Sequence, residues 1–435
     1  MSRVLLAFTL SLATAAHANG QDFVIPARLS LEEALRLAND RNPNLAAARN
    51  AVEIADAGRI DARLRPNPAV SFESEGYPLF EPSRPAFINN QELTFRVDQE
   101  LELAGRRRLR TQAAEAGVSA AEAGFRDQQR LLELDVRRGY FAVVLAKADL
   151  EVARAALDEI DKVISLNRAR HEQGEISGGE VRRIQVERLR FVDDQFAAEL
   201  ALRNARSALL ALLNAPDLGI EFDVTENLNS ADSPTSSEAL SGRLAQLDPG
   251  ALRSQALASR PDLAAAQRDV QRADTETRLQ RALRTPNVTV GGGYRRDFGA
   301  NAVVFGVTVP LPVFNRNQGG VARAEAERRQ AANRAAVTAT AVLLDVQQAI
   351  NAVDVARARV DYIEREYLTP SRESRDIVLA AYRLGSADLI DFLDAQRAFR
   401  DTLRTYNRAL YEQRVSLFQL AAATGASRQP SQVTR

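Results

Sequence analysis

The side chains that could carry out chemistry in this chain are few in kind. The 435-residue sequence contains no Cys and only two His, at positions 17 and 171. The lack of thiols excludes zinc ribbons, iron–sulfur clusters, thiol nucleophiles, a disulfide framework and a Cys lipidated at the start of the mature chain. His17 lies in a segment expected to be removed, so His171 alone cannot supply Ser-His-Asp catalysis or a His-rich metal site. The composition points away from an enzyme, and no catalytic residue, cofactor or bound metal is expected.

Carboxylates at helical spacing are the strongest remaining candidates for a functional site. Asp391 and Asp394 lie three residues apart, so they share one face of a predicted helix. Ser177 and Glu180 have the spacing of a capping box, as Ser386 has with Leu389, with Asp388 nearby. Part of this charge is therefore expected only to complement helix N-termini. Because Asp391 and Asp394 lie further into the helix, we expect that capping does not explain them. Two interpretations remain open: a functional charge cluster and an ordinary solvated helix face.

Two other motifs have ordinary structural interpretations. GRRRLR at 105–110 could bind phosphate, but at a strand-to-helix junction we expect it to face water or lipid headgroups. The glycines at 291–293 resemble a phosphate loop only superficially, because no helix with a GK[ST] ending follows, and we expect them to relax a curved strand. With 57 basic and 57 acidic side chains, the chain has no net charge to attract nucleic acid, so no nucleic-acid partner is expected.

Proline placement predicts the long elements that position these residues. No Pro occurs between 86 and 215, and Pro370 is the only one between 313 and 429. Because Pro is excluded from helix interiors, these spans can form very long helices, with a break or kink expected at Pro370. A helix from about 106 to 172 would be roughly 100 Å long at about 1.5 Å per residue. No compact globular domain can hold such a rod.

The N-terminal segment predicts export. Arg3, an apolar stretch at 4–16 and small residues at 16 and 18 form a secretory signal peptide, with cleavage expected after Ala18. A transmembrane helix needs roughly 20 apolar residues, and no later segment is expected to supply one. Any membrane span should therefore be made of strands.

An internal repeat organises the chain. NPNLAAARNAV at 42–52 recurs as RPDLAAAQRDV at 260–270, and Gly174 aligns with Gly385. Each half is predicted to contain a helix, two strands, a long helix, a turn and a helix. The expected boundaries are a signal peptide at 1–18, a first repeat at 19–216 with strands at about 68–77 and 91–103, a connection at 217–247, a second repeat at 248–426 with strands at about 287–296 and 302–313, and a C-terminal tail at 427–435.

The strands alternate in the way membrane strands do. Val70 and Phe72 alternate with Ser71 and Glu73, and a similar alternation recurs in 303–311. Four strands cannot close a barrel, since about eight are needed, and unpaired edges in lipid cost several kcal/mol per backbone group. Several copies must then share one barrel, and three would give twelve strands. The alternative is a β-hairpin on a soluble α+β protein.

Together these features resemble the TolC-type outer-membrane efflux protein family. The resemblance rests on LSLEEALRLANDRNPNLAAARNAV, on the ordered duplication and on the Gly-centred turns before Glu180 and Asp388. QELELAGRRRLR at 99–110 and PLPVFNRNQGGVARAEAE at 310–327 resemble the CzcC-like branch, which serves heavy-metal exporters of the resistance-nodulation-division type. The resemblance implies a mainly α fold with a small β part. It also implies a homotrimer with an α-helical periplasmic barrel and a shared 12-stranded β-barrel in the outer membrane of a Gram-negative bacterium.

The resemblance also implies roles for residues at the helix turns. In the family, aspartates matching Asp391 and Asp394 ring a periplasmic constriction, and a tyrosine matching Tyr382 bonds to an acidic residue matching Glu180. This sequence departs from the family where Gly179 and Ala387 replace a hydroxyl and an arginine. The turns expected to dock a periplasmic adaptor contain Gly174, Ser177, Gly178, Gly179, Gly385, Ser386 and Ala387.

The expected function is that of a passive exit duct. Its partners would be the adaptor, an inner-membrane pump of the resistance-nodulation-division type and outer-membrane lipid, and its cargo would be divalent cations such as cobalt, zinc or cadmium. The alternatives are drug efflux, a type I protein secretion duct, and a poreless periplasmic coiled-coil scaffold. The scaffold would be water-soluble, whereas the ducts would need detergent for extraction.

Overall fold

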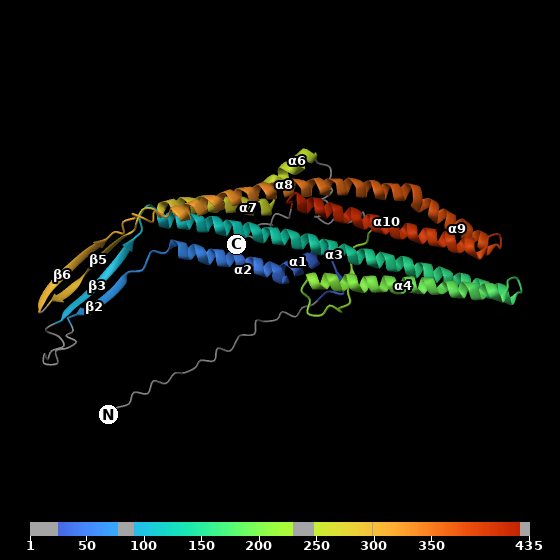
Figure 1. The fold of residues 1–435 in the computed structure, drawn as a ribbon. Helices are drawn as coiled ribbons and strands as arrows, with labels where there is room; N and C mark the ends of the chain where they lie inside the picture. Colours follow the sequence, from blue (N-terminus) through green and yellow to red (C-terminus); the bar gives the residue numbers. More distant parts are fainter. Residues whose placement is uncertain (1–24, 77–90, 229–247, 298, 427–435) are drawn as a thin grey trace, which may run out of the picture.

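A computed structural model describes residues 25–76, 91–228, 248–297 and 299–426. The chain forms a long rod of helices with a four-stranded sheet at one end and two helix-to-helix connections at the other (Figure 1). The expected signal peptide at 1–18 and tail at 427–435 lie outside the described residues, as does 229–247 of the expected connection. The fold is mainly helical with a small β part, as the sequence predicts.

The first repeat is built around one long helix. Its elements are β1 (Arg28–Leu29), α1 (Leu31–Arg41), α2 (Pro43–Arg63), β2 (Ala69–Glu75), β3 (Glu92–Leu101), α3 (Arg106–Glu172), α4 (Gly178–Leu212) and β4 (Asp223–Val224). Helix α3 runs for 67 residues without a proline and buries Leu, Val, Ile and Ala side chains along its length. The rod-length helix predicted from proline placement is confirmed.

The second repeat follows the same plan with one interruption. Its elements are α6 (Pro249–Ser259), α7 (Pro261–Ala282), β5 (Val288–Asp297), β6 (Ala300–Thr308), α8 (Gln318–Ile363), the π-helix η1 (Glu364–Leu368), α9 (Thr369–Arg383) and α10 (Leu389–Ala423). The π-helix ends at Leu368, two residues before Pro370, where the sequence predicts a break or kink, and the helix bends between α8 and α9 (Figure 1). Helices α4 and α10 are the second helices of the two hairpins, and both contain 35 residues. Their positions can therefore be compared one by one.

The sheet has the strand order β2-β3-β5-β6 and is antiparallel throughout. Its register places Phe72, Phe95, Tyr294 and Val303 in one row across all four strands. All four side chains are exposed, so this face is apolar although no part of the chain that the structure describes covers it. The opposite face carries polar side chains, including the Arg96–Asp98 ion pair at 2.9 Å. The predicted alternation is confirmed.

The glycine run in β5 has a steric reason. A Cβ on Gly291 would lie 1.8 Å from the Asp98 carboxylate, and a Cβ on Gly293 would lie 2.0 Å from the Phe95 carbonyl oxygen. Both distances are far below van der Waals contact. The glycines therefore make room for the neighbouring strand β3 and its charged side chains, which is a more specific reason than the relaxed strand expected from the sequence.

One helical stretch is long and apolar enough, by length and composition alone, to cross a membrane. Gln318–Arg383 contains an 18-residue window with a mean hydropathy of 1.2. The expectation that no later segment reaches this level is therefore wrong. Alanine supplies much of that hydropathy while presenting little apolar surface, and the same stretch forms part of the helical rod. One such helix is weak evidence for a span, because core helices pass the same test.

Candidate functional site

The two helix-to-helix connections at the end of the rod farthest from the sheet, α3–α4 and α9–α10, form the candidate site (Figure 1). Gly174 has φ 82° in the α3–α4 turn, and Gly385 has φ 78° in the α9–α10 turn. Both adopt the left-handed conformation, which glycine accepts without steric cost. In each turn, backbone N–H groups donate to carbonyls of the preceding helical turn, as Glu175 does to Arg170 and Ser386 does to Ala381, each at 2.9 Å.

The start of α10 corrects the expected role of Asp391. Asp388 is the N-cap of α10, and its carboxylate accepts from the backbone N–H of Ile390 and of Asp391. The Asp388 N–H in turn donates to the Asp391 carboxylate at 3.4 Å, which completes a capping box. Because the helix begins at Leu389, Asp391 occupies the third helical position, and the expectation that capping does not explain it is wrong. Glu180 occupies the same position in α4, where Ser177 is the N-cap.

Asp394 is a carboxylate that capping leaves unexplained. Its side chain is 65% exposed, and it pairs with Arg397 at 3.3 Å on the same helix. Asp394 is the sixth residue of α10, and the sixth residue of α4 is Arg183. The second repeat therefore presents a negative charge where the first presents a positive one. The two expected aspartates have different structural roles.

Tyr382 has a different hydrogen-bond partner from the one expected. Its side chain is 7% exposed, its ring stacks on Phe392, and its hydroxyl donates to the Asn167 side-chain oxygen at 2.8 Å rather than to Glu180. Burial raises the pKa of Tyr382 above its ordinary value, the Asn167 hydrogen bond lowers it, and the Glu180 charge raises it. The hydroxyl is therefore a neutral donor. Asn167 is itself only 1% exposed, so the partner of Tyr382 is a buried amide on α3 and not the expected acid, Glu180, on α4.

Further contacts that the sequence did not reveal join the same two helices. The Arg170 guanidinium donates to the Tyr382 carbonyl at 3.2 Å and to the Arg383 carbonyl. Arg383 pairs with Glu159 at 3.0 Å. We call these contacts, together with the Tyr382–Asn167 hydrogen bond, the α3–α9 link. Its partners lie more than 200 residues apart in sequence, and no local spacing signals them.

The residues expected at the docking turns differ in exposure. Gly174, Ser177, Gly179, Gly385 and Ser386 are exposed, whereas Gly178 and Ala387 are half-buried. Leu384 lies beside them with 84% of its surface exposed. The rod end thus presents small residues together with large exposed apolar side chains, those of Leu384 and Ile390.

The described residues offer little to a bound metal. No group of three or more His, Asp or Glu side chains within 25–76, 91–228, 248–297 and 299–426 is placed to hold an ion. His171 is exposed, and its Nδ1 lies 3.0 Å from the Ile176 carbonyl oxygen.

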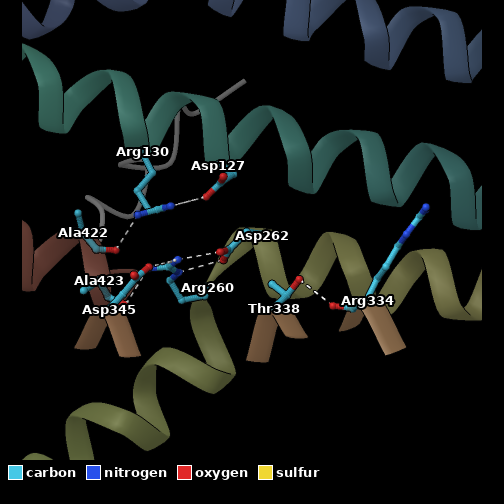
Figure 2. A network of polar contacts seen from close by, with 9 residues as sticks. All are labelled: Asp127, Arg130, Arg260, Asp262, Arg334, Thr338, Asp345, Ala422 and Ala423. Atoms are coloured by element: carbon cyan, nitrogen blue, oxygen red, sulfur yellow. Dashed lines mark hydrogen bonds and ion pairs between the residues drawn. The ribbon is translucent and has the colours of Figure 1, made fainter. Parts of the chain in front are cut away.

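A second polar network lies midway along the rod, and its contacts show that it stabilises the end of a helix (Figure 2). Arg260 is 4% exposed and contacts Asp262 at 2.7 Å, Asp345 at 3.0 Å and the Ala423 carbonyl oxygen at 3.3 Å. Burial lowers the pKa of Arg260, but the two carboxylates raise it above its ordinary value overall. Arg130 donates to the Ala422 carbonyl at 3.1 Å. The two guanidinium groups satisfy the carbonyls at the C-terminal end of α10.

Comparison with known proteins gives consistent matches along the chain. A family model described as "Outer membrane efflux protein" matches residues 34–215 and 252–426, one segment in each repeat. The cobalt-zinc-cadmium resistance protein CzcC of Cupriavidus metallidurans is 27% identical over 373 residues, which cover 85% of this chain and 83% of CzcC. The pyoverdine export outer membrane protein OpmQ of Pseudomonas putida is 24% identical over 419 residues, covering 90% and 84%. A crystal structure of CusC has a TM-score of 0.76 at 19% identity, covering 91% of this chain and 92% of CusC.

Proposed function

The chain belongs to the outer membrane efflux protein family, and on that premise we propose that it is the exit duct of a tripartite system for divalent metal cations. It would act as a homotrimer that a periplasmic adaptor connects to an inner-membrane pump of the resistance-nodulation-division type. Cobalt, zinc or cadmium would pass through it without being bound specifically. It is a channel protein and not an enzyme.

The observation that carries this proposal is the incomplete sheet. Its edge strands β2 and β6 lack a second neighbour among the described residues, and one face presents exposed Phe and Val side chains. In lipid, each unpaired backbone group costs several kcal/mol, so the edges need strands from other copies. Three copies would supply twelve strands, which is enough to close a barrel.

An apolar stripe on the rod supports the same assembly. Val186, Leu189, Phe196 and Leu200 of α4 are each at least 58% exposed, and their spacing places them along one face of the helix. A stripe of this kind is stable in water only when another helix covers it. Helices of neighbouring copies would cover it in a periplasmic tunnel.

The α3–α9 link supports a closed resting state. It holds the end of α9, and with it the α9–α10 turn, against α3 through side chains of both repeats. Opening would require these contacts to break. In a trimer, three copies of Asp394 would place carboxylates around the narrow end, where their charges would attract cations.

The cargo assignment rests on similarity together with charge. CzcC carries a cobalt-zinc-cadmium description, whereas OpmQ carries a pyoverdine description at similar coverage. The OpmQ match keeps export of organic molecules as the second candidate for the same duct. A poreless periplasmic scaffold does not fit a member of this family.

A growth experiment separates the two candidates. A deletion strain and its complemented parent would be grown across graded zinc, cobalt, cadmium, nickel and copper salts and across a panel of hydrophobic drugs. Hypersensitivity to divalent cations alone is the expected result. Sensitivity to drugs alone would retain the duct and overturn the metal cargo.

A further inference from the structure

The four connections between the sheet and the rod share a composition that the channel function does not require. They lie at one level of the molecule, where the helices give way to strands (Figure 1). Each connection exposes an apolar side chain close to an arginine in sequence. We call this set the junction belt; it comprises Leu64, Arg65, Leu103, Arg107, Arg108, Leu283, Arg284, Leu311, Val313, Phe314 and Arg316.

The apolar members of the junction belt continue the exposed face of β6. Val307, Val309 and Leu311 alternate along one side of the chain and are all exposed. Phe314 follows with 92% of its surface exposed, the highest value of any large apolar side chain in the described residues. A side chain this apolar has a free-energy cost of about 2 kcal/mol in water relative to burial. Continuity with the sheet face indicates that the same apolar phase covers both.

The arginines of the junction belt face outward without protein acids. Arg65, Arg107, Arg108 and Arg284 are exposed, and no side-chain hydrogen bond or ion pair joins them to any described residue. The nearby acids are engaged elsewhere. Glu102 accepts from Arg110 at 2.6 Å, and Glu100 accepts from the Asn287 amide at 2.6 Å.

The starts of the two long helices add to this positive charge. Helix α3 begins after Gly105 and α8 begins after Asn317; both residues have left-handed backbones, and neither side chain caps the helix. Neither first turn contains an acid, and that of α3 contains Arg106 to Arg108. Arginines at the positive end of a helix dipole are unfavourable unless an anion lies close by.

A surface hollow between two of the connections combines both features. It has a volume of about 670 Å³ and is lined by Arg284, Pro312, Val313, Phe314, Arg316 and Gln318. Three of the lining residues, Pro312, Val313 and Phe314, are apolar, and two are arginines. This pairing suits a molecule with an acyl chain on one side and a phosphate on the other.

We propose that the junction belt binds anionic phospholipids of the membrane leaflet that faces the rod. The guanidinium groups contact headgroup phosphates, and Leu311 and Phe314 enter the acyl region. The proposal rests on the proposed membrane position of the strands, and it adds a lipid preference that the duct function does not need. Guanidinium groups suit phosphates because their planar forks donate two parallel hydrogen bonds.

The test compares lipid retention by the purified full-length protein in detergent. Native mass spectrometry would count phosphatidylglycerol and phosphatidylcholine molecules retained from equimolar mixed micelles. Wild type is expected to prefer phosphatidylglycerol by at least about fivefold, the effect of roughly one arginine at an anionic surface. The variant Arg107→Gln/Arg108→Gln/Arg284→Gln should lose the preference.

Matched controls separate the belt from general positive charge. Arg328→Gln/Arg329→Gln removes an adjacent exposed arginine pair inside α8 and should keep the wild-type preference. The single variant Arg284→Gln, at the hollow, should weaken the preference without removing it, and circular dichroism would check that each variant is folded. Equal retention of both lipids by wild type, or equal loss in the α8 control, would overturn the proposal.

Two further readouts separate a lipid site from a free-anion site, and the junction belt from the duct. If inorganic phosphate displaces bound phosphatidylglycerol as effectively as an equal concentration of added phosphatidylglycerol does, the belt is an anion site and not a lipid site. Conductance of wild type in a planar bilayer is measured in parallel. A protein that conducts but shows no lipid preference overturns only the belt, whereas a protein that forms no channel overturns the proposed duct.

Discussion

The long helices of the two repeats differ in continuity. Helix α3 runs unbroken over 67 residues and packs against α1, α2, α4, α7 and α10. The matching stretch of the second repeat is interrupted by the π-helix Glu364–Leu368, none of whose residues is buried, and then by Pro370. A π-helix and a proline are among the identifiable causes of helix bending. The long helix of the first repeat is therefore continuous, whereas the matching stretch of the second repeat has a point of bending at η1.

The π-helix η1 lies between two parts of the second repeat that pack against different sets of helices. On the strand side, α8 packs against α7 and α10. On the turn side, α9 packs against α10, and the α3–α9 link ties its end to α3. The ring of Tyr362, near the end of α8, meets the ring of Tyr367, within η1, in an edge-to-face contact. This difference between the repeats supports opening by movement of α9 and α10 about η1, with α3 and α4 at rest.

The largest predicted effect concerns the hydrogen bond that satisfies the C-terminal end of α4 in the first repeat and of α10 in the second. Asn42 donates to the Leu212 carbonyl at the end of α4, and Arg260 donates to the Ala423 carbonyl at the end of α10. Arg260→Ala leaves the partly buried Asp262 carboxylate and the Ala423 carbonyl without their donor, and should lower the free energy of unfolding by about 3 kcal/mol. Asn42→Ala loses one cap and should cost about 1 kcal/mol. Denaturant unfolding in detergent would measure both, and equal losses would contradict this difference between the repeats.

A smaller effect is predicted for the α3–α9 link. Tyr382→Phe removes the hydroxyl that donates to Asn167, a loss of about 1 kcal/mol, which should shift the closed-to-open ratio toward open by about fivefold. Adding Arg383→Gln should increase the shift. Single-channel recording in a planar bilayer measures the open fraction.

The first repeat supplies the control for the link. His171 and Glu172 end α3 as Tyr382 and Arg383 end α9. Because neither belongs to the α3–α9 link, Glu172→Gln should leave the open fraction at its wild-type value. An open fraction raised equally by Glu172→Gln and Arg383→Gln would show that gating does not depend on the second repeat.

The smallest predicted effect concerns the carboxylates at the turns. Asp394→Asn should reduce the ratio of cation to anion permeability by about twofold, because a ring of exposed charges is screened by salt. Glu180→Gln is the control, since that residue lies in the first turn of α4. Reversal potentials in a salt gradient give the ratio. Unchanged selectivity in Asp394→Asn would rule out the carboxylate ring.

The sequence predicts the elements better than their partners, for a physical reason. Long proline-free spans and alternating apolar residues are local properties, so α3, the four strands and the duplication can be inferred directly. The role of Asp391 depends on α10 starting at Leu389, and a one-turn error in that boundary reverses the interpretation. The Tyr382–Asn167 hydrogen bond joins residues 215 positions apart, and only helix packing sets that register.

Cysteine cross-links can test directly whether the second-repeat hairpin opens while the first-repeat hairpin stays closed. The chain contains no Cys, so introduced cysteine pairs are the only thiols present. Glu159→Cys/Arg383→Cys replaces an ion pair between α3 and α9, and Asp161→Cys/Arg188→Cys replaces one between α3 and α4. A bifunctional maleimide would link either pair, and single-channel conductance would follow.

We predict that the 159–383 cross-link holds the channel closed and that the 161–188 cross-link leaves conductance as it was before linking. Equal conductance after both cross-links, or closure by both, would contradict opening at the second-repeat hairpin alone.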